Sequence, residues 1–134
     1  MAAPTIHFRI CFAKNANVGP GKIDLLEAIR RRGSLSSAAR ELGMSYRRAW
    51  LLLQSLNKSF KTPVTLATTG GRGGGGAAVT EFGEQLIRSY RRLDRDISVV
   101  AATRLHSIMP AVVRRAPPKS RAAGRSLRPR LGAR

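Results

Sequence analysis

The chain has 134 residues and a formal net charge of +18 at pH 7, with 25 lysines and arginines against seven acids. This length fits one domain with extensions and one modest hydrophobic core. The charge exceeds the needs of solubility and indicates a polyanionic partner, with nucleic acid first and an anionic membrane surface second. No apolar run approaches the roughly 20 residues that span a bilayer, so we do not expect a membrane protein.

The cysteine content and the first residues bear on the compartment. Cys11 is the single cysteine, so the chain forms no intramolecular disulfide, which suits a reducing compartment. We expect this side chain to act as a small buried hydrophobe. The first ten residues, MAAPTIHFRI, lack the basic region and apolar run of a secretory signal. We therefore expect a cytoplasmic protein.

Residues 5–13 alternate in polarity, which predicts a half-buried N-terminal strand. The side chains that share the inward face are Ile6, Phe8, Ile10 and Phe12. Residues 15–21, NANVGPG, consist largely of turn-forming residues and predict a loop. Residues 22–32 then predict a first helix, because apolar side chains recur at helical spacing. These inward residues are Ile23, Leu26 and Ile29.

Residues 34–60, SLSSAARELGMSYRRAWLLLQSLNKSF, predict two short helices joined by a tight turn. Ser34 is a good N-cap for the first helix, and Ser45 is a good N-cap for the second. Gly43 most readily takes the left-handed conformation that ends a helix. Together these features predict a helix-turn-helix. The alternative is a plain two-helix hairpin in an all-α protein, with its arginines merely solvated.

The second helix of this pair carries the candidate DNA-binding residues. Its inward seam has spacings of four, three and four, and consists of Ala49, Leu53, Leu56 and Phe60. Its first turn lies largely off that seam and presents two hydroxyls beside two cations. Arginine suits both phosphate oxygens and the edge of guanine. We therefore predict DNA contacts by Ser45, Tyr46, Arg47 and Arg48.

A glycine-rich segment lies between two short predicted strands, residues 64–66 and 77–79. Residues 68–77, TTGGRGGGGA, contain six glycines around Arg72 and match neither a phosphate-binding Walker loop nor a dinucleotide fingerprint. A flexible linker is the alternative. A centred cation between two strands favours a wing, with Gly71, Arg72 and Gly73 against the DNA backbone or in a minor groove.

The last predicted helix, residues 80–104, begins at Thr80, which is a good N-cap. Apolar residues recur along it at spacings close to those of a coiled coil, beyond what so small a core can cover. We predict that this helix dimerises through a seam of Leu86, Tyr90, Leu93, Ile97 and Val100. The alternative is that its first half packs on the core and its second half frays.

The composition changes after residue 104. The segment holds eight cations, no acid and several prolines, which predicts a disordered basic tail over residues 105–134. Without those eight cations the remainder would still carry a charge of +10. The sequence thus predicts a DNA-binding domain over residues 1–104. Its fold class is mainly α with a small β wing, an α+β winged helix-turn-helix with an N-terminal strand and a long C-terminal helix.

The residues give no indication of an enzyme. The two histidines, His7 and His106, lack metal-ligand spacing, and the seven acids are scattered rather than paired. We expect no catalytic residue, no metal and no cofactor. Two alternatives to a transcription regulator remain open: a nucleoid-type architectural DNA binder without operator preference, and an adaptor that binds a partner through the long helix.

Two motifs, SYRRAW at residues 45–50 and the glycine-rich segment followed by VTEFG at residues 79–83, carry a family resemblance. Over residues 20–92 the chain resembles the N-terminal winged helix-turn-helix domain of the molybdate-dependent regulators of the ModE family. It is more distantly similar to LysR-type regulators. The resemblance implies a homodimeric bacterial transcription regulator that binds operator DNA.

The resemblance also assigns residues. It places Ser45, Tyr46, Arg47 and Arg48 on the recognition helix and Arg72 with its glycines in the wing. Trp50 belongs to the motif, but its position, beneath the wing or against a phosphate, stays open. Regulators of this family carry a C-terminal oxyanion-binding region, and here a basic tail follows instead. We therefore do not expect molybdate sensing within this chain.

Overall fold

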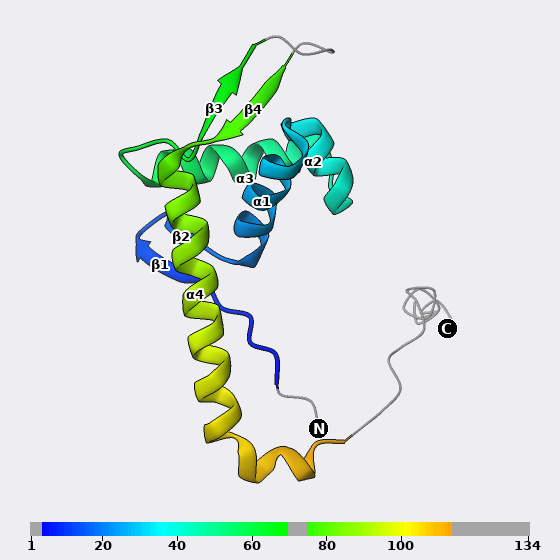
Figure 1. The fold of residues 1–134 in the computed structure, drawn as a ribbon, viewed down its shortest axis with the longest axis vertical. Helices are drawn as coiled ribbons and strands as arrows, with labels where there is room; N and C mark the ends of the chain where they lie inside the picture. The colour runs from blue at the N-terminus through cyan, green and yellow to red at the C-terminus, as the bar shows by residue number, and fades with distance from the viewer. Residues whose placement is uncertain (1–3, 70–74, 114–134) are drawn as a thin grey trace, which may run out of the picture. The chain divides into compact units, whose positions relative to one another are not determined.

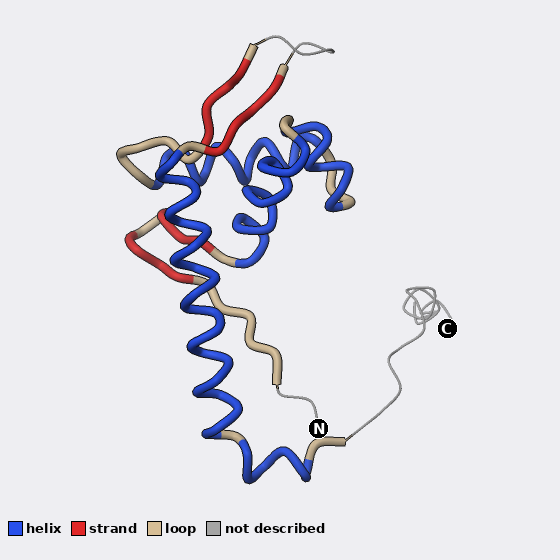
Figure 2. Tube along the Cα trace, viewed as in Figure 1, coloured by secondary structure: helices blue, strands red, loops and turns tan. Residues whose placement is uncertain are grey.

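The computed structural model of the protein describes residues 4–69 and 75–113. The chain divides into two units, residues 1–104 and residues 105–134. The described elements of the first unit are β1 (Ile10–Ala13), β2 (Ala16–Val18), α1 (Pro20–Arg32), α2 (Leu35–Leu42), α3 (Tyr46–Ser59), β3 (Thr65–Thr68), β4 (Gly76–Val79) and α4 (Glu81–Arg104) (Figures 1 and 2). The predicted fold class, mainly helical with a small β wing, is confirmed.

The helix-turn-helix of α2 and α3 begins and ends at the predicted residues. The backbone N–H of Ser37 donates a 3.1 Å hydrogen bond to the Ser34 hydroxyl, and that of Arg48 donates a 3.0 Å bond to the Ser45 hydroxyl. Gly43 ends α2 with a φ of 70°, a conformation that side chains with a Cβ rarely adopt. The turn between the two helices is therefore fixed by local chemistry.

Buried side chains form two adjoining clusters beneath the helices. One unites α1, α3 and α4 with β2, and it consists of Val18, Ile23, Leu26, Leu56, Val64, Leu86, Ile87 and Tyr90. The other holds α1, α2 and α3 together through Leu25, Ala28, Ile29, Ala38, Ala39 and Ala49. Small alanines at these contacts let the helices approach closely. The inward positions predicted for α1 are thus confirmed.

The hairpin of β3 and β4 is antiparallel, with Thr65 opposite Val79 and Thr68 opposite Gly76. The Ala77 N–H donates a 2.9 Å hydrogen bond to the Gly33 carbonyl, which ties β4 to the end of α1. In Figure 1 this hairpin projects beyond the helices, as a wing does. Its register and this tie fix the two ends of the glycine-rich segment.

The start of α4 lies close to the base of the wing. The Thr80 hydroxyl accepts a 3.0 Å hydrogen bond from the Gly83 N–H and donates a 2.7 Å bond to the Pro63 carbonyl, so the predicted cap is confirmed. A Cβ on Gly83 would collide with the Val64 carbonyl oxygen and with the Val79 side chain. Glycine is therefore required here by packing, which explains the VTEFG motif.

The N-terminal prediction is wrong in its boundaries. Only residues 10–13 of the predicted strand form β1, and residues 16–18, which we predicted as loop, form its antiparallel partner β2. The two-residue turn is possible because Asn15 takes a φ of 65°, which asparagine tolerates better than most residues. Phe12 and Cys11 are exposed, so the expected burial of Cys11 is wrong as well.

The second unit begins with structure rather than with disorder. Among its described residues, η1 (His106–Ala111) forms a 3₁₀ helix, followed by residues 112 and 113. Short-range hydrogen bonds, such as the 3.0 Å bond from the Ile108 N–H to the Leu105 carbonyl, need no long-range packing. The prediction of disorder from residue 105 is therefore wrong for this turn, and residues 114–134 of the predicted tail lie outside the described residues.

Candidate nucleic-acid interface

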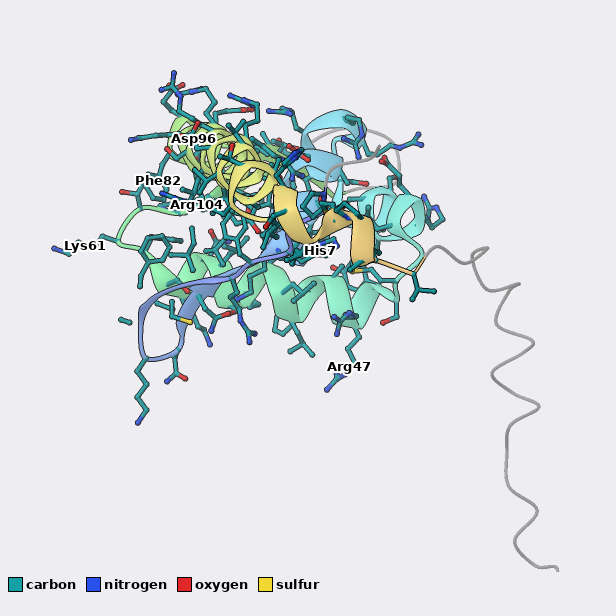
Figure 3. All side chains as sticks on the ribbon, turned by 90° about the horizontal axis from the view of Figure 1, so that it is seen from below. His7, Arg47, Lys61, Phe82, Asp96 and Arg104 are labelled. Atoms are coloured by element: carbon teal, nitrogen blue, oxygen red, sulfur yellow. The ribbon has the colours of Figure 1, made fainter. Side chains whose placement is uncertain are left out.

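The first turn of α3 presents the four predicted DNA-binding residues to solvent. Ser45, Arg47 and Arg48 are exposed, and Tyr46 is 56% exposed. Neither arginine forms an ion pair with any residue that the structure describes, so both guanidinium groups keep their donors available. Figure 3 shows Arg47 pointing away from the body of the molecule, on the side opposite α4. The structure thus brings these side chains together on one surface.

Trp50 follows on the same outer face of α3, one turn after Tyr46. It is 44% exposed, and its neighbour Leu51 is exposed to a similar extent. Trp50 therefore does not close the core, which α3 fills with Ala49 and Leu56 instead. The sequence indicates this exposure, because Trp50 and Leu51 both lie outside the inward seam of α3.

The acids of the chain are segregated from α3. No acid occurs in residues 1–23 or 43–80, which include α3 and both hairpins. All seven acids belong to α1, α2 and α4, namely Asp24, Glu27, Glu41, Glu81, Glu84, Asp94 and Asp96. The segments that form α3 and both hairpins therefore carry cations and no acid, a charge distribution that attracts a polyanion.

The arginines of α1, together with Arg91 of α4, are engaged with those acids. Arg91 lies 2.7 Å from a Glu27 oxygen and 2.9 Å from an Asp24 oxygen, and its hydrogen bond holds the pKa of Glu27 below the usual range. Arg30 lies 2.6 Å from Glu84. Glu41 pairs with Arg31 and Arg32, and hydrogen bonds from these two lower its pKa. The arginine run that ends α1 is thus occupied within the domain.

The structure describes only the two ends of the glycine-rich segment, residues 68–69 and 75–77. Gly71, Arg72 and Gly73 lie outside the residues that the structure describes. The strands that flank them, β3 and β4, pair as predicted. A contact of Arg72 with DNA therefore stays a prediction.

The predicted dimer seam consists of buried residues in the first half of α4 and more exposed residues in its second half. Leu86 and Tyr90 are 9% and 3% exposed, because they pack into the core of their own chain. They are covered already, so their assignment to a seam between two copies is wrong. Leu93 and Val100 are 38% and 55% exposed, and Ile97 is half-buried. The second half of α4 thus keeps an apolar stripe on its surface.

Two features are absent from the described residues. Over residues 4–69 and 75–113, no helix combines the length and apolar character that crossing a bilayer requires. Within the same ranges, no three histidines, cysteines or acids come close enough together to bind a metal ion. Neither observation adds a candidate site to the surface around α3.

Comparison with known proteins places this arrangement in a family context. Residues 21–84 match the family described as bacterial regulatory helix-turn-helix protein, lysR family. The chain is 43% identical over 83 residues to the molybdenum-pterin-binding protein MopB of Rhodobacter capsulatus, covering 62% of this chain and 31% of that protein. It is 38% identical over 73 residues to the molybdenum transport protein ModE of Azotobacter vinelandii, covering 54% of this chain and 27% of that one.

A third relative is named as a regulator. The chain is 37% identical over 78 residues to the transcriptional regulator ModE of Haemophilus influenzae, which covers 58% of this chain and 31% of the relative. The chain thus spans less than a third of the length of each of these relatives. The similarity therefore concerns one region of these longer proteins.

Proposed function

We propose that this chain, whose helix-turn-helix region is of the ModE type, is a sequence-specific DNA-binding transcriptional regulator. One observation carries the proposal: the first turn of α3 holds Arg47 and Arg48 exposed, within a chain segment, residues 43–80, that contains no acid. That turn is the part of a helix-turn-helix that enters the major groove.

The recognition chemistry follows from the side chains of this turn. Arg47 points away from the body of the molecule in Figure 3 and would donate two hydrogen bonds to the O6 and N7 atoms of a guanine. Arg48 would take the same role or bind a phosphate. The hydroxyls of Ser45 and Tyr46 lie beside them and would donate to phosphate oxygens, which fixes the register of α3 on the duplex.

The wing would add a contact on the flanking DNA. The pairing of β3 with β4 and the bond between Ala77 and Gly33 hold the two ends of the segment that contains Gly71, Arg72 and Gly73. Glycines let a backbone approach phosphates closely, and a narrow minor groove attracts arginine. Binding weakens as salt rises, and the slope of log K against log salt is negative. Replacing Arg72 by alanine should reduce the magnitude of this slope by about one unit.

The basic tail would contribute affinity without reading sequence. Residues 106–134 carry eight cations and no acid, so their contacts would be electrostatic. Deleting these residues should weaken binding to every duplex and flatten the salt slope by several units, since each neutralised phosphate contributes about 0.9. Discrimination between sequences should survive the deletion, because it would reside in residues 1–104.

The biological unit that fits best is a homodimer. Leu93, Ile97 and Val100 leave an apolar stripe on the second half of α4. A second copy of the chain would cover it, as the spacing of a coiled-coil seam requires. A two-fold dimer would place two recognition helices on half-sites about 34 Å apart.

The test is the effect of Arg47→Ala on a duplex selected by this protein and on a shuffled duplex. Loss of a bidentate guanine contact costs about 1–3 kcal/mol, so binding to the selected duplex should weaken roughly 5- to 150-fold while the shuffled duplex changes less. Arg92→Ala is the matched control, because Arg92 is an exposed cation on α4, away from α3. Equal losses on both duplexes would instead favour an architectural binder.

A further inference from the structure

We propose that the β1–β2 hairpin and the outer face of α3 together bind one strand of the DNA backbone, next to the base-reading turn. This inference rests on the proposed DNA-binding function and adds a second contact surface to it. A hollow of about 620 Å³ lies between the two elements. Its lining residues include Lys14 and Asn15 on the hairpin and Trp50, Leu51, Gln54 and Lys58 on α3.

The hairpin is held firmly against α3. On β2, Ala16 and Val18 are buried in the core, so the strand cannot swing away without exposing them. The Lys22 ammonium donates a 2.9 Å hydrogen bond to the Asn17 carbonyl and a 2.8 Å bond to the Ser55 hydroxyl, and so bridges β2 and α3. The two-residue turn therefore presents Lys14 at a defined place beside the helix.

The lining of the hollow matches a phosphodiester strand in charge. Lys14 lines it from the hairpin and Lys58 lines it from α3, and no acid is among its lining residues. The amides of Asn15 and Gln54 add hydrogen-bond donors suited to phosphate oxygens. Trp50 supplies an apolar surface of the kind that packs against a deoxyribose ring. A lysine-lined trough with an exposed aromatic residue thus fits a sugar-phosphate backbone.

The position of the hollow relative to Arg47 favours duplex DNA as its occupant. Figure 3 shows the β1–β2 hairpin projecting to the same side of the molecule as Arg47. Lys58 follows Arg47 by eleven positions on α3, which at 1.5 Å per residue is about 16 Å along the helix. The major groove is about 12 Å wide. When the first turn of α3 lies in the major groove, its last turns, about 16 Å away, therefore reach the DNA strand that borders the groove.

The test compares the salt dependence of DNA binding for the full chain and for the double variant Lys14→Gln, Lys58→Gln. The slope of log K against log salt is negative, and loss of two phosphate contacts should reduce its magnitude by about two units. Binding should weaken equally on selected and shuffled duplexes. Binding of a duplex by the unaltered chain should also change the fluorescence of Trp50, the single tryptophan. Lys61→Gln is the matched control, since Lys61 is exposed but does not line the hollow.

Three outcomes are informative. A reduced slope with retained discrimination and unchanged thermal unfolding supports the inference. An unchanged slope in the double variant, while the unaltered chain binds DNA, overturns the inference and leaves the proposed function standing. If the unaltered chain binds no duplex at any salt concentration, the proposed function fails and the inference fails with it.

Discussion

The hydroxyl of Tyr90 on α4 donates a 2.7 Å hydrogen bond to the backbone carbonyl oxygen of Phe8, and the two rings stack with their centroids 4.6 Å apart. Burial raises the pKa of the Tyr90 hydroxyl. This pair joins the segment before β1 to the middle of α4, eighty-two positions later in the chain. It also explains why Tyr90 belongs to the core of its own chain.

Replacing Tyr90 by phenylalanine tests this link. The ring keeps its stacking on Phe8, but the carbonyl oxygen loses its donor, so we expect the free energy of unfolding to fall by about 0.5–1.5 kcal/mol. Chemical denaturation measures the change. Tyr46→Phe is the control, because the Tyr46 side chain is exposed and its loss of a hydroxyl should leave stability unaltered. Equal stability of Tyr90→Phe and the unaltered chain would contradict the prediction.

Gly83→Ala should destabilise the domain through overpacking. The added methyl group would collide with the Val64 carbonyl oxygen, which is backbone and cannot move aside cheaply. We expect a loss of about 1–3 kcal/mol in the free energy of unfolding. The control is Gly21→Ala, since a Cβ on Gly21 meets nothing within 4 Å and lies in a helix. That change should be neutral or stabilising, and a Gly83→Ala variant as stable as this control would refute the packing argument.

The parts that could be predicted from the sequence are those fixed by local chemistry. Ser34, Gly43 and Ser45 act within three residues of themselves, so the helix-turn-helix could be placed before its packing was known. The sequence predicts that Arg47 and Arg48 face DNA, because both lie outside the inward seam of α3. Their contact with DNA stays a prediction, but their exposure is confirmed.

The parts that could not be predicted depend on contacts between distant segments. Ala16 and Asn17 have little strand propensity, and β2 forms because Val18 is buried against residues of α1 and α4. Tyr90 fits a coiled-coil spacing as well as a core position, and only its partner Phe8 decides between them.

Glu27 should make stability depend on pH. Its pKa is lowered in the folded chain by the hydrogen bond from Arg91, so its contribution is present above the ordinary glutamate value of about 4.3 and is lost as pH falls through the lower folded pKa. Glu27→Gln should therefore cost about 1 kcal/mol at pH 7 and much less near pH 3. Urea denaturation at both pH values measures this.

The matched control for Glu27 is Asp96→Asn. Asp96 is exposed and forms no ion pair within residues 4–69 and 75–113, so its replacement should leave the free energy of unfolding nearly unaltered at either pH. A Glu27→Gln variant whose cost stayed the same at pH 7 and pH 3 would show that the carboxylate charge is not what Arg91 stabilises.

A charge on the apolar stripe of α4 should break the proposed homodimer. In Leu93→Asp or Ile97→Asp, the carboxylate would lose its water at the seam without gaining a partner, so the chain should become monomeric while remaining folded. Sedimentation reports the mass, and circular dichroism reports the fold. Val99→Asp is the control, because Val99 is exposed but lies off the stripe. An unaltered chain that already sediments as a monomer would end the dimer proposal.

The most direct measurement of the central claim is selection of duplexes from a random pool by the full chain, followed by titration of the enriched and shuffled sequences at about 150 mM salt. A sequence-specific regulator should enrich one motif and bind it at least 10³-fold more tightly than its shuffled form, with most of that ratio lost in Arg47→Ala. Recovery of no motif, with equal affinity for all duplexes and a steep salt dependence, would contradict the account.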